Sequence, residues 1–167
     1  MPKTLVLVPS RTGRMAALAD AIVEGARSVR FAEVDVRRLD EPGAVTLAGY
    51  DAIVLAAPAE ADDASGALTG LLDQAGTLLD VVGSAFAAPP PDGRATALWS
   101  LLASMGTRGM ILVTPGTAPS VDPGATSDDA ALAAAREQGR RVATVAGWVR
   151  HAKGHEHGHS HSHGLSL

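Results

Sequence analysis

The sequence predicts an α/β fold, an open doubly wound sheet of five parallel strands in the order 2-1-3-4-5 with helices on both faces. Short apolar runs of strand length alternate with stretches whose apolar residues recur at helical spacing, which is typical of a parallel sheet covered by helices. Right-handed crossovers favour the doubly wound order, whose ligand crevice lies where the winding reverses, between the first and third strands.

The expected strands differ in how deeply they should be buried. Residues 32–36 alternate apolar and acidic side chains, which is typical of an edge strand with one exposed face. The run from Ile53 to Ala56 is continuously apolar, as in a central strand buried on both faces. The other strands are expected at residues 5–8, 81–87 and 110–113.

Helices are expected after the first, third, fourth and fifth strands. The first begins near Met15 and carries one apolar stripe as far as Ala26. Ser65 is expected to cap the second, and the third is expected from Arg94 to Met105. The last is expected to start at Ser127 and to end at about Arg150.

Three aromatic residues are interpreted as packing residues. Trp99 lies at helical spacing with Leu101 and Leu102, which predicts an anchor in the core rather than a side chain that stacks on a ligand. Tyr50 and Trp148 are interpreted in the same way.

Composition limits the class of protein. The chain of 167 residues is 46% hydrophobic, enough for one domain, expected at residues 1–150, followed by a flexible His-rich tail at 151–167. Its net charge of −4 disfavours nucleic acid and anionic membrane surfaces as partners. The start lacks an apolar export segment and no apolar run approaches the ~20 residues that span a bilayer, so a cytoplasmic protein is expected.

Residues 9–15 connect the first strand to the first helix and contain two hydroxyls and a glycine. The Ser10 and Thr12 hydroxyls, loop N–H groups turned by Gly13, and the free N–H groups that open the helix would converge on one anion. A bound phosphate would therefore lie at the carboxyl end of the first strand. The same residue types also suit an ordinary strand-to-helix turn, so both interpretations stay open.

Several other kinds of site are excluded. The loop lacks the Gly-Lys-Ser/Thr ending of a nucleotide-triphosphate loop and the three spaced glycines of a dinucleotide site. A chain without cysteine has no disulfide and no cysteine phosphatase loop. All six histidines lie between residues 151 and 163, so the predicted domain contains no Ser-His-Asp triad.

Short motifs follow one another over about residues 3–149. They are Ser10–Met15 with Ala19–Ala26, Tyr50–Ile53, Ser65–Gly66 with Leu72–Gly76, Leu98–Gly106, Pro123–Thr126 and Ala135–Gly139. Together they resemble flavodoxin-like NAD(P)H:quinone oxidoreductases of the tryptophan-repressor-binding-protein family. The Ser-Gly…Leu-Asp-Gln-Ala-Gly and Gly-Ala-Thr segments are fairly specific to that family, because ordinary helices do not require them.

The resemblance implies that FMN binds in the crevice, that its ring accepts hydride from NAD(P)H and passes electrons to a quinone, and that the protein is a homodimer or homotetramer. It assigns the FMN phosphate to Ser10, Arg11, Thr12, Gly13, Arg14 and Met15. By position, it assigns the flavin ring to loops 58–65 and 87–94, with Pro58, Ala59, Glu60, Ala88 and Gly93 as candidate contacts.

These two ring loops depart from the family pattern. The family has a Thr-Pro-x-Arg-aromatic-Gly-Asn sequence after the third strand, where this chain has acidic residues at Glu60, Asp62 and Asp63. The acids either repel a reduced flavin ring or form a solvated face ahead of a helix start, and a divalent cation site is a further alternative. The second loop contains Pro89 to Pro91, which have no N–H to donate to the ring.

The last histidines of the chain recur at every second residue. In an extended segment this spacing places the imidazoles on one side, where several can chelate one Zn, Ni or Cu ion. The candidate metal ligands are His155, His157, His159, His161 and His163. An added purification tag or a disordered terminus is the alternative interpretation.

Three functions follow from these features. The first is an FMN-dependent NAD(P)H:quinone reductase. The second is a flavodoxin-like binding module that has lost its flavin, and the third is a metal-handling protein that acts through its His-rich tail. The fold alone does not decide among them.

Overall fold

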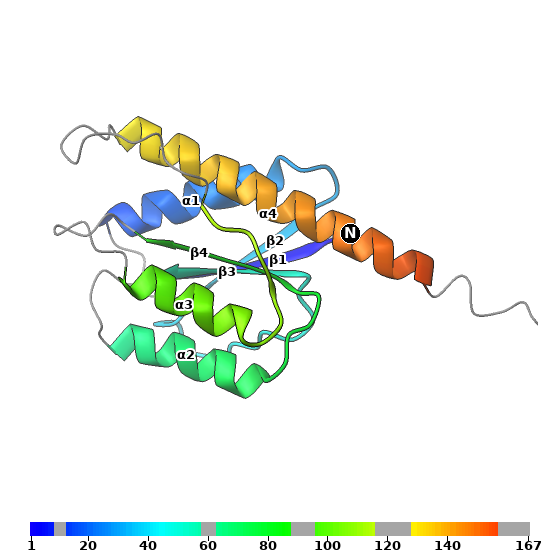
Figure 1. Cartoon of the computed structure of the whole chain (residues 1–167). Coiled ribbons are helices and arrows are strands. Elements are labelled where there is room, and N and C mark those ends of the chain that lie inside the picture. The colour runs from blue at the N-terminus through cyan, green and yellow to red at the C-terminus, as the bar shows by residue number, and fades with distance from the viewer. Residues whose placement is uncertain (9–12, 58–62, 88–95, 116–127, 157–167) are drawn as a thin grey trace, which may run out of the picture.

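The computed structural model describes residues 1–8, 13–57, 63–87, 96–115 and 128–156. These residues form a parallel five-stranded sheet in the order β2-β1-β3-β4-β5, with helices on both faces (Figure 1). The predicted fold class and the order 2-1-3-4-5 are confirmed. The strands are β1 (Lys3–Val8), β2 (Glu33–Arg38), β3 (Ala52–Ala57), β4 (Val82–Ala87) and β5 (Ile111–Leu112).

The burial of the strands follows their place in the sheet. Every residue of β3 is at most 1% exposed, because β1 and β4 flank it and helices cover both its faces. Strand β2 pairs only with β1 and is partly exposed, as expected of an edge strand. At the other edge, β5 is shorter than expected and both its residues are exposed.

The helices divide into two layers. Helices α1 (Gly13–Arg27) and α4 (Asp128–Glu156) cover one face of the sheet, and α2 (Asp63–Ala75) and α3 (Thr96–Gly106) cover the other (Figure 1). Alternate residues of β1 enter two separate cores: Val6 packs with α1 and α4, whereas Leu5 packs with α2 and α3. Among the residues that the structure describes, no helix is both long and apolar enough to cross a membrane.

Two helix boundaries differ from those expected. Helix α2 begins at Asp63, so Ser65 lies inside the first turn and is not the cap. Helix α4 continues to Glu156, well beyond Arg150, so residues 151–156 are helical rather than part of a flexible tail. Long-range ion pairs hold these extra turns against the rest of the fold, and the local sequence pattern did not reveal them.

The prediction that both tryptophans pack in the core is wrong. Trp99 on α3 is 62% exposed and Trp148 on α4 is 69% exposed. The buried faces of their helices are filled by smaller aliphatic residues such as Leu102 and Val142. Tyr50 does pack, half-buried, against the core beneath α2 and α3.

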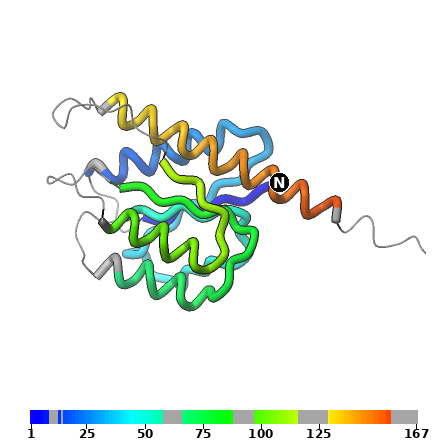
Figure 2. Tube along the Cα trace, in the orientation of Figure 1, coloured from blue at the N-terminus to red at the C-terminus, as the bar shows by residue number. Residues whose placement is uncertain are grey.

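Helices α1 and α4 run side by side and touch through their backbones (Figure 2). A Cβ atom on Gly25 would lie 1.8 Å from the carbonyl oxygen of Arg136, and one on Gly139 would lie 2.0 Å from that of Ile22. Only glycine fits at either position. At the exposed side of this crossing, Arg136 Nε donates to Glu24 Oε2 at 2.7 Å.

The substitution Gly139→Ala should destabilise the fold by about 3 kcal/mol, at the upper end of the usual cost of overpacking, because the new methyl group forces two packed helices apart. The matched control is Gly147→Ala on the same helix, where the new Cβ would meet only Pro2 Cγ at 4.0 Å. The control should gain up to about 1 kcal/mol from helix propensity. Thermal unfolding measures the melting temperatures of both variants, and 1 kcal/mol of stability corresponds to a shift of roughly 2–4 °C for a chain of this size. Equal melting temperatures for the two variants would contradict the contact.

Candidate functional site

Three strands of the sheet end at the same edge and are each followed by a helix. Strands β1, β3 and β4 end at Val8, Ala57 and Ala87, and because the sheet is parallel, the helices that follow all begin at that carboxyl edge (Figure 1). Helix α1 then covers one face and α2 the other, so the winding reverses between β1 and β3. A crevice outside these two strand ends is where doubly wound sheets bind their ligands.

The start of α1 suits an anion. Gly13 has φ +67°, in the left-handed region that favours glycine, and open space where a Cβ would be. The first turn, from Gly13 to Ala16, contains no acidic residue, so the positive end of the helix dipole is not neutralised from within the helix. The free N–H groups of this turn can therefore bind a phosphate.

Other helices at the same edge carry their own negative charge. Helix α2 begins with Asp63, and α4 begins with Asp128 and Asp129. Acidic residues in the first turn of a helix generally offset its dipole. The first turn of α3 is also free of acidic residues. Of these two starts, that of α1 follows the strand end where the winding reverses, which makes it the candidate anion site of this edge.

Most of the predicted site residues lie outside the residues that the structure describes. These are Ser10, Arg11, Thr12, Pro58, Ala59, Glu60, Ala88 and Gly93, together with His157, His159, His161 and His163. Gly13 and Arg14 open α1, as the phosphate prediction requires. The side chain of Met15 packs against the core between α1 and the sheet, so only its backbone N–H would serve a phosphate.

A groove of about 490 Å³ adjoins the start of α1 on the β2 side. Val8 at the end of β1 and Ala16 in the first turn of α1 line it, together with Arg38 and Glu41 from the end of β2. The groove continues between α1 and β2 as far as Arg27, the last residue of α1.

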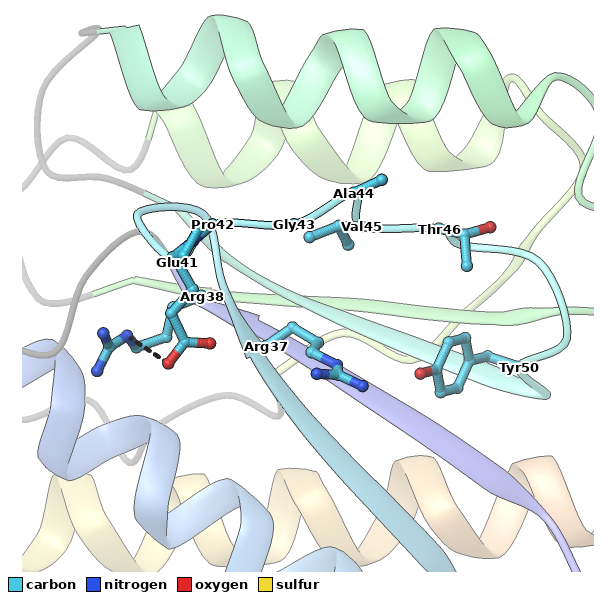
Figure 3. Close-up of a pocket in the computed structure, with 9 residues that line it drawn as sticks. All are labelled: Arg37, Arg38, Glu41, Pro42, Gly43, Ala44, Val45, Thr46 and Tyr50. Atoms are coloured by element: carbon cyan, nitrogen blue, oxygen red, sulfur yellow. Dashed lines mark ion pairs between the residues drawn. The ribbon is translucent and has the colours of Figure 1, made fainter.

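A smaller pocket of about 170 Å³ opens beyond the edge strand β2 (Figure 3). Arg38 Nε in this pocket pairs with Glu41 at 3.3 Å and with Asp40 at 3.0 Å, and Arg37 extends toward Tyr50. Burial raises the pKa of the Tyr50 hydroxyl, and its 2.9 Å hydrogen bond to Asp35 raises that pKa further. The pocket takes no residue from the helix starts at the carboxyl edge, so it is distinct from the predicted ligand site.

A buried network of polar groups joins β4 to α4 beneath the carboxyl edge of the sheet. The Gln138 side-chain amide donates to Ser84 Oγ and to the Ala85 carbonyl, both at 2.8 Å, and Ser84 Oγ donates to the Val113 carbonyl at 2.5 Å. The network joins α4, β4 and the residue that follows β5. Sequence reasoning missed it, because Ser84 lies in an otherwise apolar strand and Gln138 in a helix rich in polar residues.

His155 lies in the last turns of α4, at the opposite end of the molecule from the carboxyl edge (Figure 1). Its Nε2 atom is 3.0 Å from that of His151. Within the described ranges, no group of three or more acidic or histidine side chains is arranged to hold a metal ion.

Comparison with known proteins identifies relatives by sequence. No protein-family model matches the chain. It is 36% identical over 141 residues to an NAD(P)H dehydrogenase (quinone) of Cupriavidus metallidurans, covering 68% of this chain and 70% of that protein. It is 31% identical over 196 aligned positions to an NAD(P)H dehydrogenase (quinone) of Methylocella silvestris, and the alignment covers 88% of this chain and 98% of that protein. The chain belongs to the NAD(P)H dehydrogenase (quinone) family.

The family resemblance predicted from the motifs is thereby confirmed. The Methylocella alignment has more positions than this chain has residues, so that family member contains segments that this chain lacks.

Solved structures confirm the flavodoxin fold. A flavodoxin, WrbA-like protein from Agrobacterium tumefaciens superposes with a TM-score of 0.58 at 20% identity, covering 89% of this chain and 99% of that one. A flavone reductase superposes with a TM-score of 0.67 at 19% identity, covering 90% of this chain and 65% of that one.

The substitution Ser84→Ala should lower stability by about 1–3 kcal/mol, because it leaves the buried Val113 carbonyl without its side-chain donor and removes one partner of Gln138. The control is Ser100→Ala on α3, where the residue is exposed and where alanine is the better helix former. Denaturant unfolding measures the free energy of unfolding of both variants. Equal losses in the two variants would contradict a supporting role for the network.

Proposed function

We propose that this chain is an FMN-binding flavodoxin-like protein that acts as an NAD(P)H:quinone oxidoreductase. Membership of the quinone-reductase family supports the activity. The observation that carries the cofactor assignment is the start of α1, where a left-handed Gly13 and an acid-free first turn follow β1 at the point where the winding of the sheet reverses.

The residues present at this position fit a phosphate group. The N–H groups of Gly13, Arg14 and Met15 lie in the first turn of α1, where the helix dipole favours negative charge. The hydroxyls of Ser10 and Thr12 immediately precede them in the sequence. These groups would hold the FMN phosphate, and the connections after β3 and β4 would contact the ring, as the family resemblance implies.

The chain's own contribution to the reaction is binding and orientation. When bound, FMN supplies hydride acceptance and electron transfer, which no side chain of this protein can supply. The buried strands β1 and β3 fix the ends between which the cofactor would bind, and the network at Ser84 fixes β4 beside them. In keeping with the family resemblance, we further propose a cytoplasmic homodimer or homotetramer.

An FMN titration of the purified chain tests the proposal. Binding should quench FMN fluorescence with micromolar or tighter affinity, and adding NAD(P)H should bleach the visible absorption of the complex, which a quinone should restore. A chain that binds inorganic phosphate but not FMN would instead favour the binding-module alternative.

The substitution Gly13→Ala tests the phosphate site. A side chain at left-handed φ costs about 1–2 kcal/mol, and relief of that strain would move the first N–H groups of α1 away from the anion. FMN affinity should fall by about tenfold, equivalent to roughly 1.4 kcal/mol.

The matched control is Gly49→Ala, which has the same kind of strain (φ +85°) and the same open space, but precedes β3 at the opposite edge. It should lose similar stability and keep its FMN affinity. Equal FMN affinities in the two variants would contradict the assignment of the FMN phosphate to the start of α1.

A further inference from the structure

The last turns of α4 carry a pair of histidines whose ring nitrogens face each other. His151 and His155 are four residues apart, so they lie on one face of the helix, and both side chains are exposed. Their Nε2 atoms are 3.0 Å apart. In the metal-free pair, one Nε2–H donates to the other Nε2.

We propose that this pair is a two-nitrogen chelate for Cu²⁺ or Ni²⁺. Two histidines at this helical spacing are a recognised metal-binding arrangement. The 3.0 Å separation shows that both Nε2 atoms are within reach of one ion once the rings turn their lone pairs toward it. Zn²⁺ sites in proteins have three or four protein ligands, whereas Cu²⁺ binds a given set of nitrogen ligands more tightly than Zn²⁺ does, and imidazole also suits Ni²⁺.

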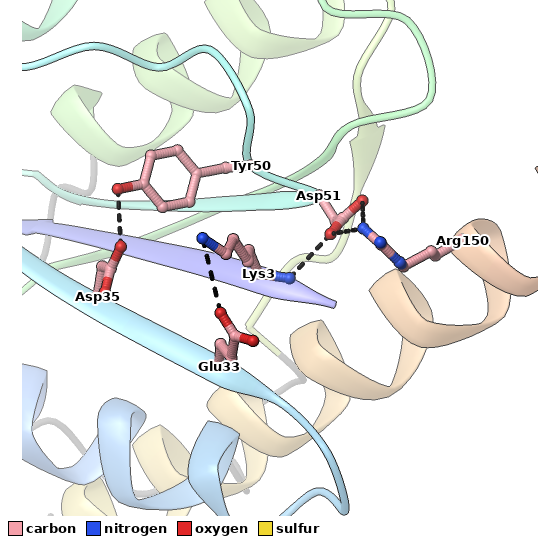
Figure 4. Close-up of polar contacts among 6 residues, drawn as sticks. All are labelled: Lys3, Glu33, Asp35, Tyr50, Asp51 and Arg150. Atoms are coloured by element: carbon pink, nitrogen blue, oxygen red, sulfur yellow. Dashed lines mark hydrogen bonds and ion pairs between the residues drawn. The ribbon is translucent and has the colours of Figure 1, made fainter. Parts of the chain in front are cut away.

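The helix end is held in place for this role. Arg150 Nη1 pairs with Asp51 Oδ2 at 3.0 Å, and the same carboxylate accepts the backbone N–H of Lys3 at 2.8 Å (Figure 4). Lys153 pairs with Asp80 at 3.5 Å. These contacts fix the last turns of α4 against the residue that precedes β3, which is itself bonded to the start of β1, and against the turn that leads into β4.

The local charge also suits a cation. The two cationic side chains nearest in sequence, Arg150 and Lys153, are each partnered by a carboxylate, which offsets their repulsion of a metal ion. The negative end of the α4 dipole lies in the same turns. When a metal binds the neutral pair, the donating ring shifts its proton to Nδ1, so both Nε2 lone pairs bind the ion without net proton loss.

Isothermal titration of the full-length chain with CuCl₂, NiCl₂ or ZnCl₂ tests the proposal. The variant H157Q/H159Q/H161Q/H163Q removes the later histidines and keeps the pair. It should bind one Cu²⁺ or Ni²⁺ per chain, more tightly than Zn²⁺. Adding His151→Gln or His155→Gln should weaken binding at least about tenfold, the loss of one of two ligands. Absence of binding in the four-histidine variant, or no change on adding His151→Gln, would overturn the proposal.

A matched pair of substitutions at Gly154 separates a helical chelate from two independent histidines. A Cβ on Gly154 would meet nothing within 4 Å, so Gly154→Ala in the same four-histidine variant should retain the binding. Gly154→Pro should weaken it as much as His151→Gln does, because proline breaks the helix between the two rings while leaving both in the chain. Retained metal affinity in the proline variant would show that binding does not require the two histidines to be on one face of a helix. None of these readouts depends on FMN, because the pair lies at the opposite end of α4 from the proposed cofactor site (Figure 1).

Discussion

The contact between the backbones of α1 and α4 is the constraint on which the rest of the fold depends. Glycine at positions 25 and 139 lets each helix approach the other's carbonyl groups more closely than any side chain would allow. The two helices therefore form one rigid layer over β1, β3 and β4. Because α1 is held by that layer along its length, its first turn is fixed beside the end of β1, at the point where an anion would bind.

The electrostatics of the carboxyl edge follow from the same arrangement. Parallel strands deliver several helix starts to one edge, and each start contributes a partial positive charge. The sequences of α2 and α4 begin with acidic residues, whereas α1 and α3 have none in the first turn. A chain with a net charge of −4 repels anions overall, so binding of a phosphate at this edge requires a local, uncompensated helix start, and that of α1 is the one that follows the strand end where the winding reverses.

The sequence was sufficient for the features that depend on local pattern. The apolar runs at 5–8 and 53–56 located the central strands, and their alternation with helices gave the sheet order. Helical spacing alone did not show which side of α3 faces the core, so Trp99 was misplaced. The end of α4 depends on Asp51 and Asp80, which are far away in the sequence, and no local signal marks these ion pairs.

In the candidate site, too, local sequence patterns predict some features and long-range contacts determine the others. Topology and the glycine that opens α1 predict a phosphate site at the start of that helix, because a strand, a short connection and a helix are adjacent in the sequence. The network of Ser84, Gln138 and the Val113 carbonyl joins segments more than 20 residues apart, and each of its side chains is unremarkable in its own segment. The ring contacts depend on loops whose composition departs from the family, so position alone assigns them.

Helix α4 connects the two proposed sites without coupling them strongly. Its 29 residues span about 43 Å at 1.5 Å per residue, from the carboxyl edge to the histidine pair. The glycine contact fixes the middle of the helix, and the ion pairs at Arg150 and Lys153 fix its end, so neither ligand needs the helix to move. Free energies at sites this far apart, with no shared partners, add independently. Metal at one end and cofactor at the other should therefore each stabilise the same rigid layer by their own binding free energy.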